Sequence, residues 1–137
     1  MSATMYKVTK QIDFCYGHRL MDYDGKCRHP HGHNGRAEIT LAAEALDGRG
    51  MVVDFGDIKA ALKAWIDANL DHRMLLRRDD PLVPILQGLG EPVFLTDQNP
   101  TAETIARAIL EEGRRRGLPV WEVRLWETPD SYASCTG

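Results

Sequence analysis

The stretch Cys27-Arg28-His29-Pro30-His31-Gly32-His33-Asn34 is the part of the chain from which the fold and the chemistry are predicted. In an extended backbone, residues i and i+2 point to the same side, so the imidazoles of His31 and His33 can reach one metal ion. A third nitrogen ligand has to come from elsewhere, and His18 is the natural candidate. Three imidazoles with one position left open are typical of a catalytic zinc site, whereas structural zinc sites fill all four positions.

A structural zinc site is the alternative interpretation of the same stretch. Cys27 and His29 could join His31 and His33 and close around the ion. Ligands packed so tightly leave no intervening loop of the length that zinc fingers use, which favours the catalytic interpretation. Cys27 lies four residues before His31, so its sulfur can approach the metal without being a ligand.

Length and composition are those of one ordinary globular domain, predicted over residues 1–137. The 137 residues are 43% hydrophobic and 27% charged, with a formal net charge of −3. No apolar run approaches the length of a membrane span, and the first residues do not resemble a signal peptide, so a cytoplasmic location without disulfides is expected. No stretch combines Lys and Arg with aromatic residues, and nucleic-acid binding is therefore not expected.

The hydrophobic pattern predicts an α+β fold. Alternation predicts strands at residues 5–14, 37–43 and 121–126, with shorter ones at 51–53 and 93–95. Helices are predicted to start after caps at Asp54 and Thr101 and to end near residues 70 and 117. We expect an antiparallel sheet of about four strands with two helices packed on one face. Such a sheet has open edges, and pairing between subunits is a common remedy, so a homo-oligomer is expected.

Other residues near these elements could take part in chemistry. Cys27 beside a dication is expected to be a reactive thiolate, although a small inert hydrophobe is the alternative. The Asp71-His72 pair at a helix end has the form of an oriented general base, although it could be a surface pair. Taken alone, Glu127 at a strand end is better explained as a solvated surface carboxylate. Glu103 in the first turn of a helix is explained by its favourable interaction with the helix dipole.

Six motifs in order resemble one family. They are Phe14 to Leu20 ending in His-Arg-Leu, Cys27-x-x-x-His31-Gly-His33-Asn34, Gly50 to Phe55, Leu70-Asp71-His72, Pro100-Thr101-Ala102-Glu103 and Trp126-Glu127-Thr128. In this order they resemble the 6-pyruvoyltetrahydropterin synthase family, which includes the bacterial 6-carboxytetrahydropterin synthases of queuosine precursor synthesis. The match runs from about residue 5 to 132.

The resemblance implies a tunnelling fold (T-fold), in which subunits join their sheets into an oligomeric barrel, commonly a homohexamer built as a dimer of trimers. It implies a zinc ion on His18, His31 and His33. It further implies that Cys27, Asp71 and His72 are catalytic and that Glu127, with Glu103, binds the pterin. These assignments are carried over from the motifs.

The activity implied is the zinc-dependent conversion of 7,8-dihydroneopterin triphosphate to 6-carboxy-5,6,7,8-tetrahydropterin, a lyase reaction. A 6-pyruvoyltetrahydropterin synthase, which eliminates triphosphate from the same substrate, is the close alternative. A non-catalytic zinc-stabilised interaction module is the alternative from another class. The chain departs from the family pattern at Gly35, where an aromatic residue is usual, and at Cys15-Tyr16-Gly17, where small residues are usual.

Overall fold

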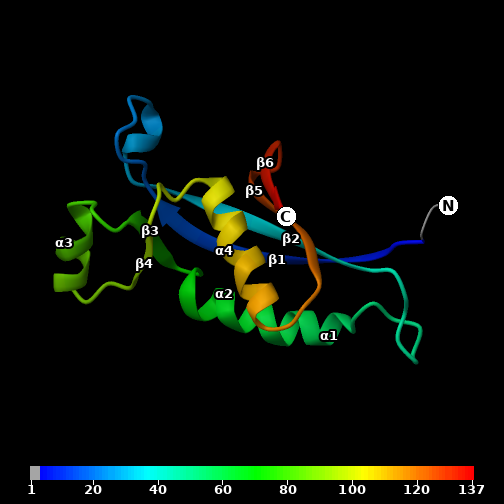
Figure 1. The fold of residues 1–137 in the computed structure, drawn as a ribbon. Coiled ribbons are helices and arrows are strands. Elements are labelled where there is room, and N and C mark those ends of the chain that lie inside the picture. Colours follow the sequence, from blue (N-terminus) through cyan, green and yellow to red (C-terminus); the bar gives the residue numbers. More distant parts are fainter. Residues whose placement is uncertain (1–3) are drawn as a thin grey trace.

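The computed structural model describes residues 4–137, and two long antiparallel strands form its centre. These strands, β1 (Tyr6–His18) and β2 (His31–Ala43), have 13 residues each and pair along their whole length. Figure 1 shows them crossing the molecule, joined at one end by a loop with a short 3-10 turn at Lys26–Arg28. β1 was predicted to end at Phe14 but continues to His18, which places that histidine within the strand.

The sheet has six strands and is mixed, which corrects the expected antiparallel sheet of four. Its order is β4-β3-β1-β2-β5-β6. β5 (Val120–Thr128) pairs antiparallel with β2, and β6 (Ser131–Thr136) pairs antiparallel with β5. On the other side, β3 (Arg73–Arg77) runs parallel to β1, and β4 (Val93–Thr96) runs parallel to β3. The α+β class itself is confirmed.

Two strands were missed and one was wrongly predicted. β6 is short and polar, and β3 carries only a brief apolar run, so neither gives a clear alternating pattern. Residues 51–53 form no strand, and residues 52 and 53 are bends. There the Asp47 side chain accepts the backbone N–H groups of Arg49 and Met51, and the helix cap Asp54 follows at once. Backbone groups satisfied locally in this way are not free for a ladder.

The two predicted helices are confirmed, together with their caps. Residues 55–69 form α1 (Phe55–Ile58), a π-helical turn (Lys59–Lys63) and α2 (Ala64–Asn69), and Asp54 accepts the Gly56 N–H at 2.7 Å. α4 (Ala102–Arg115) starts at Thr101, whose hydroxyl accepts the Thr104 N–H. A third helix, α3 (Leu82–Gly88), was not predicted because Pro84 looked like a breaker; it lies in the first turn, where no N–H is needed.

One face of the sheet packs against these helices. Alternate residues of β1, β2 and β5 join residues of α1, the π-helical turn, α2 and α4 in one buried cluster. Its largest fully buried members are Ile39, Leu41, Ile58, Leu62, Ile66, Leu70, Leu75, Ile105, Ile109, Leu125 and Val123. The same alternation carries the core-facing side of β1 past Tyr16 to His18. Within residues 4–137, no helix is both long and apolar enough to cross a membrane.

Candidate functional site

Three histidines meet where β1 and β2 end. His18 is the last residue of β1 and lies opposite His31, the first residue of β2, while His33 lies opposite Tyr16. All three side chains are on the core-facing side, because β2 residues 31, 33, 35 and 37 alternate onto one face. Their ring centroids are 4.5 to 5.0 Å apart, and one ring nitrogen of each lies within 4.8 Å of the others. The hairpin therefore assembles the three histidines that the sequence singled out.

Hydrogen bonds fix two of the rings so that a nitrogen remains free. His18 Nδ1 lies 2.7 Å from the carbonyl oxygen of Pro100, and His31 Nδ1 lies 2.8 Å from that of His29. A neutral imidazole that donates from Nδ1 keeps the Nε2 lone pair for a metal, and such second contacts are usual for metal-binding histidines. Burial lowers the pKa of His18, which favours the neutral form that ligation requires.

The donor set and its spacing fit a divalent metal ion. His18 Nε2 and His33 Nε2 are 3.1 Å apart. Two nitrogens bound tetrahedrally to zinc would be about 3.4 Å apart, given bond lengths of about 2.0–2.1 Å. Within residues 4–137, the ligand atoms that converge here come from three histidines, and neither Cys27 nor His29 is among them. The converging atoms therefore match the three-imidazole interpretation of the sequence and not the four-ligand structural site.

Tyr16 supports the cluster from the core side. Its ring is stacked on Phe14 and meets His18 edge-on, with centroids 5.2 Å apart. The ring fits there because residue 35 on the neighbouring strand is glycine: a Cβ at this position would lie 2.8 Å from Cε1 of Tyr16. Burial, and then the charge of Glu127, raise the pKa of Tyr16, so the phenol stays neutral beside the histidines.

A cavity beside His18 is lined by the thiol of Cys27 and by Glu103 and Glu127, the two carboxylates that were predicted to bind substrate. Its volume is about 530 Å³, and it is lined by His18, Cys27, Glu103 and Glu127 together with parts of β6 and the start of α4. Glu127 Oε2 lies 3.7 Å from His33 Nε2, so the carboxylate borders the histidine cluster. One chain thus brings these four residues around one space, with the histidine cluster at its wall.

Asp71 and His72 lie elsewhere, on a turn between α2 and β3. Asp71 Oδ2 is 2.9 Å from His72 Nδ1, and its Oδ1 accepts the backbone N–H of Cys15 at 2.9 Å. Burial opposes ionisation of Asp71, but the Cys15 N–H and His72 outweigh it, so its pKa is lowered. The carboxylate therefore stays charged and orients the imidazole, as expected for a general base.

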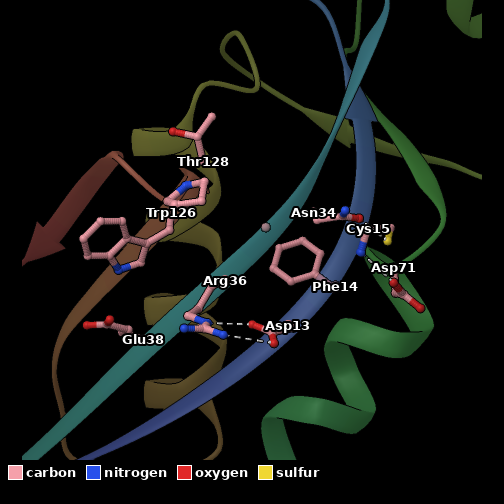
Figure 2. Close-up of a pocket in the computed structure, with 11 residues that line it drawn as sticks. Asp13, Phe14, Cys15, Asn34, Arg36, Glu38, Asp71, Trp126 and Thr128 are labelled. Atoms are coloured by element: carbon pink, nitrogen blue, oxygen red, sulfur yellow. Dashed lines mark hydrogen bonds and ion pairs between the residues drawn. The ribbon is translucent and has the colours of Figure 1, made fainter.

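The structure does not bring this pair to Cys27 within one chain. Asp71 lines a cavity of about 660 Å³ on the sheet face opposite the helices, together with Cys15, Asn34 and Trp126 (Figure 2). His72 lines a groove with residues of β1, β2 and β3, and Cys27 lines neither space. The sequence identified the pair but not its neighbour Cys15, which is 56 positions from Asp71. Only the pairing of β1 with β3 reveals that contact.

Two further contacts brace the segment that follows His18. Arg19 forms a bidentate ion pair with Asp80, whose side chain is fully buried, and the Nε–Oδ2 distance is 2.7 Å. The side-chain oxygen of Asn99, next to Pro100, accepts the Met21 N–H at 2.8 Å. The ends of β1 and β3 and the start of α4 are thereby tied together around the histidine cluster.

Comparisons with known proteins point to the same family as the sequence motifs. Residues 7–137 match the family model described as 6-pyruvoyl tetrahydropterin synthase. A protein of Rickettsia bellii named 6-carboxy-5,6,7,8-tetrahydropterin synthase is 38% identical over 135 residues, which cover 93% of this chain and 98% of that protein. A protein of the same name from Rickettsia typhi is 46% identical over 104 residues, covering 74% of this chain and 75% of that protein.

Solved structures of similar proteins share the fold of this chain over nearly its whole length. An uncharacterised Wolinella succinogenes protein superposes with a TM-score of 0.84 at 30% identity, over 98% of this chain and 99% of that one. The Caenorhabditis elegans 6-pyruvoyl tetrahydropterin synthase superposes with a TM-score of 0.73 over 100% of this chain and 99% of that one. Its 22% identity supports the fold alone. With the ordered motifs, the histidine cluster and the family match in place, the chain belongs to the 6-pyruvoyl tetrahydropterin synthase family.

Proposed function

We propose that this chain is a 6-carboxy-5,6,7,8-tetrahydropterin synthase that uses zinc and acts on 7,8-dihydroneopterin triphosphate. The observation that carries the proposal is the cavity in which Cys27, Glu103 and Glu127 meet His18 of the three-histidine cluster. The curated relatives that share 38% and 46% identity with the chain carry this name. The 6-pyruvoyl alternative draws its support from the description of the family model.

His18, His31 and His33 would hold the zinc. When bound there, it would supply a Lewis acid for the hydroxyl-bearing side chain of the substrate. Glu127 accepts hydrogen bonds from the amino and N–H groups of the pterin edge, because a carboxylate offers two acceptor oxygens side by side. Glu103 lines the same cavity and completes the pterin contacts. Tyr16 closes the inner side of the cluster and keeps water from it.

Cys27 and His72 move the protons. In this proposal the thiolate of Cys27 accepts a proton from the substrate side chain, and His72, oriented by Asp71, exchanges a proton at the other face. The contact that supports the second role is the 2.9 Å distance between Asp71 Oδ2 and His72 Nδ1. An imidazole oriented in this way can alternate between acceptor and donor.

A homo-oligomer, proposed to be a hexamer of two trimers, would complete the site. Cys27 and the Asp71-His72 pair line different spaces in one chain, and the strands β4 and β6 are the sheet's edges. Joining subunits through these edges would cover unpaired backbone groups and could bring Asp71-His72 of one subunit to Cys27 of its neighbour. Analytical ultracentrifugation at several concentrations tests the assembly; a monomer at assay concentration would contradict it.

The function itself is tested by product identification. Zinc-loaded protein is incubated with 7,8-dihydroneopterin triphosphate and the pterins are identified by mass spectrometry. We expect 6-carboxytetrahydropterin, and no product after chelation until zinc is restored. A 6-pyruvoyl product would establish the alternative synthase. No turnover, together with unfolding on chelation, would favour the interaction module, because a zinc-stabilised fold is lost without its ion.

A further inference from the structure

We propose that Cys15, Asp71 and His72 form a second divalent-metal site, separate from the three-histidine cluster and suited to a zinc-type cation. One ligand atom of each residue (a thiol sulfur, a carboxylate oxygen and an imidazole nitrogen) lies within 4.8 Å of the other two. Sulfur, nitrogen and oxygen donors in one site are a ligand set that zinc accepts in tetrahedral geometry.

The sheet places this group on the other side of β1. Phe14 and Tyr16 point into the core, so Cys15 between them points to the opposite face. There it lies beside the turn that carries Asp71, as Figure 2 shows, where Cys15, Asn34 and Asp71 come together. The histidine cluster extends from the core-facing side. The two groups therefore share no ligand, and one can be altered without the other.

The group is held by the backbone as well as by side chains. The N–H of Cys15 donates to Asp71 Oδ1 at 2.9 Å, and the N–H of His72 donates to the carbonyl oxygen of Cys15 at 2.6 Å. His72 has a φ of +58°, a left-handed conformation that a residue with a side chain adopts at a cost. These contacts hold the turn in the conformation that places the imidazole beside the thiol and the carboxylate.

The surroundings of the sulfur also suit ligation. The thiol of Cys15 donates a hydrogen bond to Asn34 Oδ1, with 2.9 Å between the two atoms, and rotation of that amide would present its N–H groups to a metal-bound thiolate. Cys15 is partly buried and has no disulfide partner. His72, with 79% of its side chain exposed, leaves an open path for an ion from solvent. A thiol that coordinates a cation gives up its proton, so metal binding at this site would release a proton.

A metal ion bound at this site is expected to affect turnover, and this expectation rests on the proposed function. An ion bound to Asp71 and His72 occupies the pair assigned to proton transfer. Excess zinc is therefore expected to inhibit turnover, with Cys15 determining how tightly the inhibitory ion binds. Cys15 itself has no part in the proposed reaction, so replacing it removes the metal site and leaves the reaction groups in place.

Cobalt(II) titration of the metal-free full-length chain tests the site without any assay of turnover. We expect two equivalents to bind, and the second to give a near-ultraviolet charge-transfer band from thiolate to cobalt. Cys15→Ser should lose that band and the second equivalent, whereas Cys27→Ser, the matched control, should keep both. His31→Ala should keep the band while losing the ion bound by the three-histidine cluster. Circular dichroism confirms that each variant is folded, and His72→Ala, which removes an exposed side chain, provides a second test.

The results separate this proposal from the proposed function. Binding of a single equivalent, or a band that survives Cys15→Ser and disappears in Cys27→Ser, would overturn the second site. If the bands behave as expected, steady-state assays then compare inhibition by excess zinc in the wild type and Cys15→Ser. Resistance of the variant supports the regulatory consequence, and equal inhibition of both contradicts it. A chain without pterin synthase activity would still give the cobalt result.

Discussion

The two histidine-containing clusters of this chain differ in how they are held. The rings of His18, His31 and His33 sit at the end of the central hairpin, and two of them are fixed by backbone carbonyls. His72 has a largely exposed ring that depends on a strained turn and one carboxylate. Metal binding benefits from ligands that cannot move, whereas groups that exchange protons must be reachable. In the proposed function, His18, His31 and His33 are the rigid half of a site, and Asp71 and His72 are its accessible half.

The largest effect is expected from breaking the rigid half. His31→Ala should reduce the zinc content to a small fraction of one ion per chain at the histidine cluster and lower turnover roughly a thousandfold or more. Metal analysis after extensive dialysis and steady-state assays measure both. His29→Ala is the matched control, because its imidazole is not among the converging ligand atoms. Full zinc retention in His31→Ala would remove this residue from the metal site.

Whether the two halves meet between subunits is tested by combining two inactive variants. Cys27→Ala and His72→Ala should each keep the zinc ion of the three-histidine cluster and lose about 100-fold or more in turnover. Co-expressed with different tags and purified as mixed oligomers, they should recover about one quarter of wild-type activity if neighbouring subunits share each site. Mixed oligomers as inactive as the parents would mean that the two halves do not meet between subunits.

A substitution at Glu127, which borders the histidine cluster, is expected to weaken substrate binding without affecting metal binding. Glu127→Gln keeps the shape but exchanges one acceptor oxygen for a donor, which should cost about 1–3 kcal/mol of substrate interaction. We expect kcat/KM to fall accordingly and the zinc content to stay unchanged. Steady-state kinetics with zinc quantified in each sample measure this, with Glu103→Gln as comparator from the same cavity. Kinetics like the wild type would exclude Glu127 as the pterin anchor.

Asp80 tests the ion pair that braces the segment after His18. Arg19 holds the pKa of Asp80 below its ordinary value of 3.8, so this stabilisation is full above that value and is lost as the pH falls through the lower folded pKa. Asp80→Asn should lower the free energy of unfolding by about 2–3 kcal/mol at pH 7. The difference in the free energy of unfolding between the wild type and Asp80→Asn should become smaller in acid.

Chemical denaturation between pH 7 and pH 3 measures that difference, with zinc quantified at pH 7. A constant difference across this range would show that the ion pair with Arg19 is not its source. Zinc content should stay at the wild-type level at pH 7, since neither residue contacts the histidine rings directly.

The sequence predicted local features better than distant ones. The spacing of His31 and His33 is a property of one strand, and the caps Asp54 and Thr101 act within a few residues, so these predictions were confirmed. β3 and β6 are strands because of what they pair with, since their own patterns are weak. The contact of Cys15 with Asp71 likewise depends on the approach of distant segments. The roles of the individual site residues in catalysis and substrate binding stay predictions.

The fit between Tyr16 and Gly35 constrains how this chain could have changed over time. A Cβ at position 35 would lie too close to the Tyr16 ring, so a side chain there requires the ring to move or residue 16 to become smaller. Conversely, the Tyr16 ring in its present position fits beside a glycine at position 35. The two positions lie on adjacent strands but 19 residues apart in the sequence. They should therefore covary among related chains, with the ancestral order of substitutions recoverable from chains in which only the glycine is present.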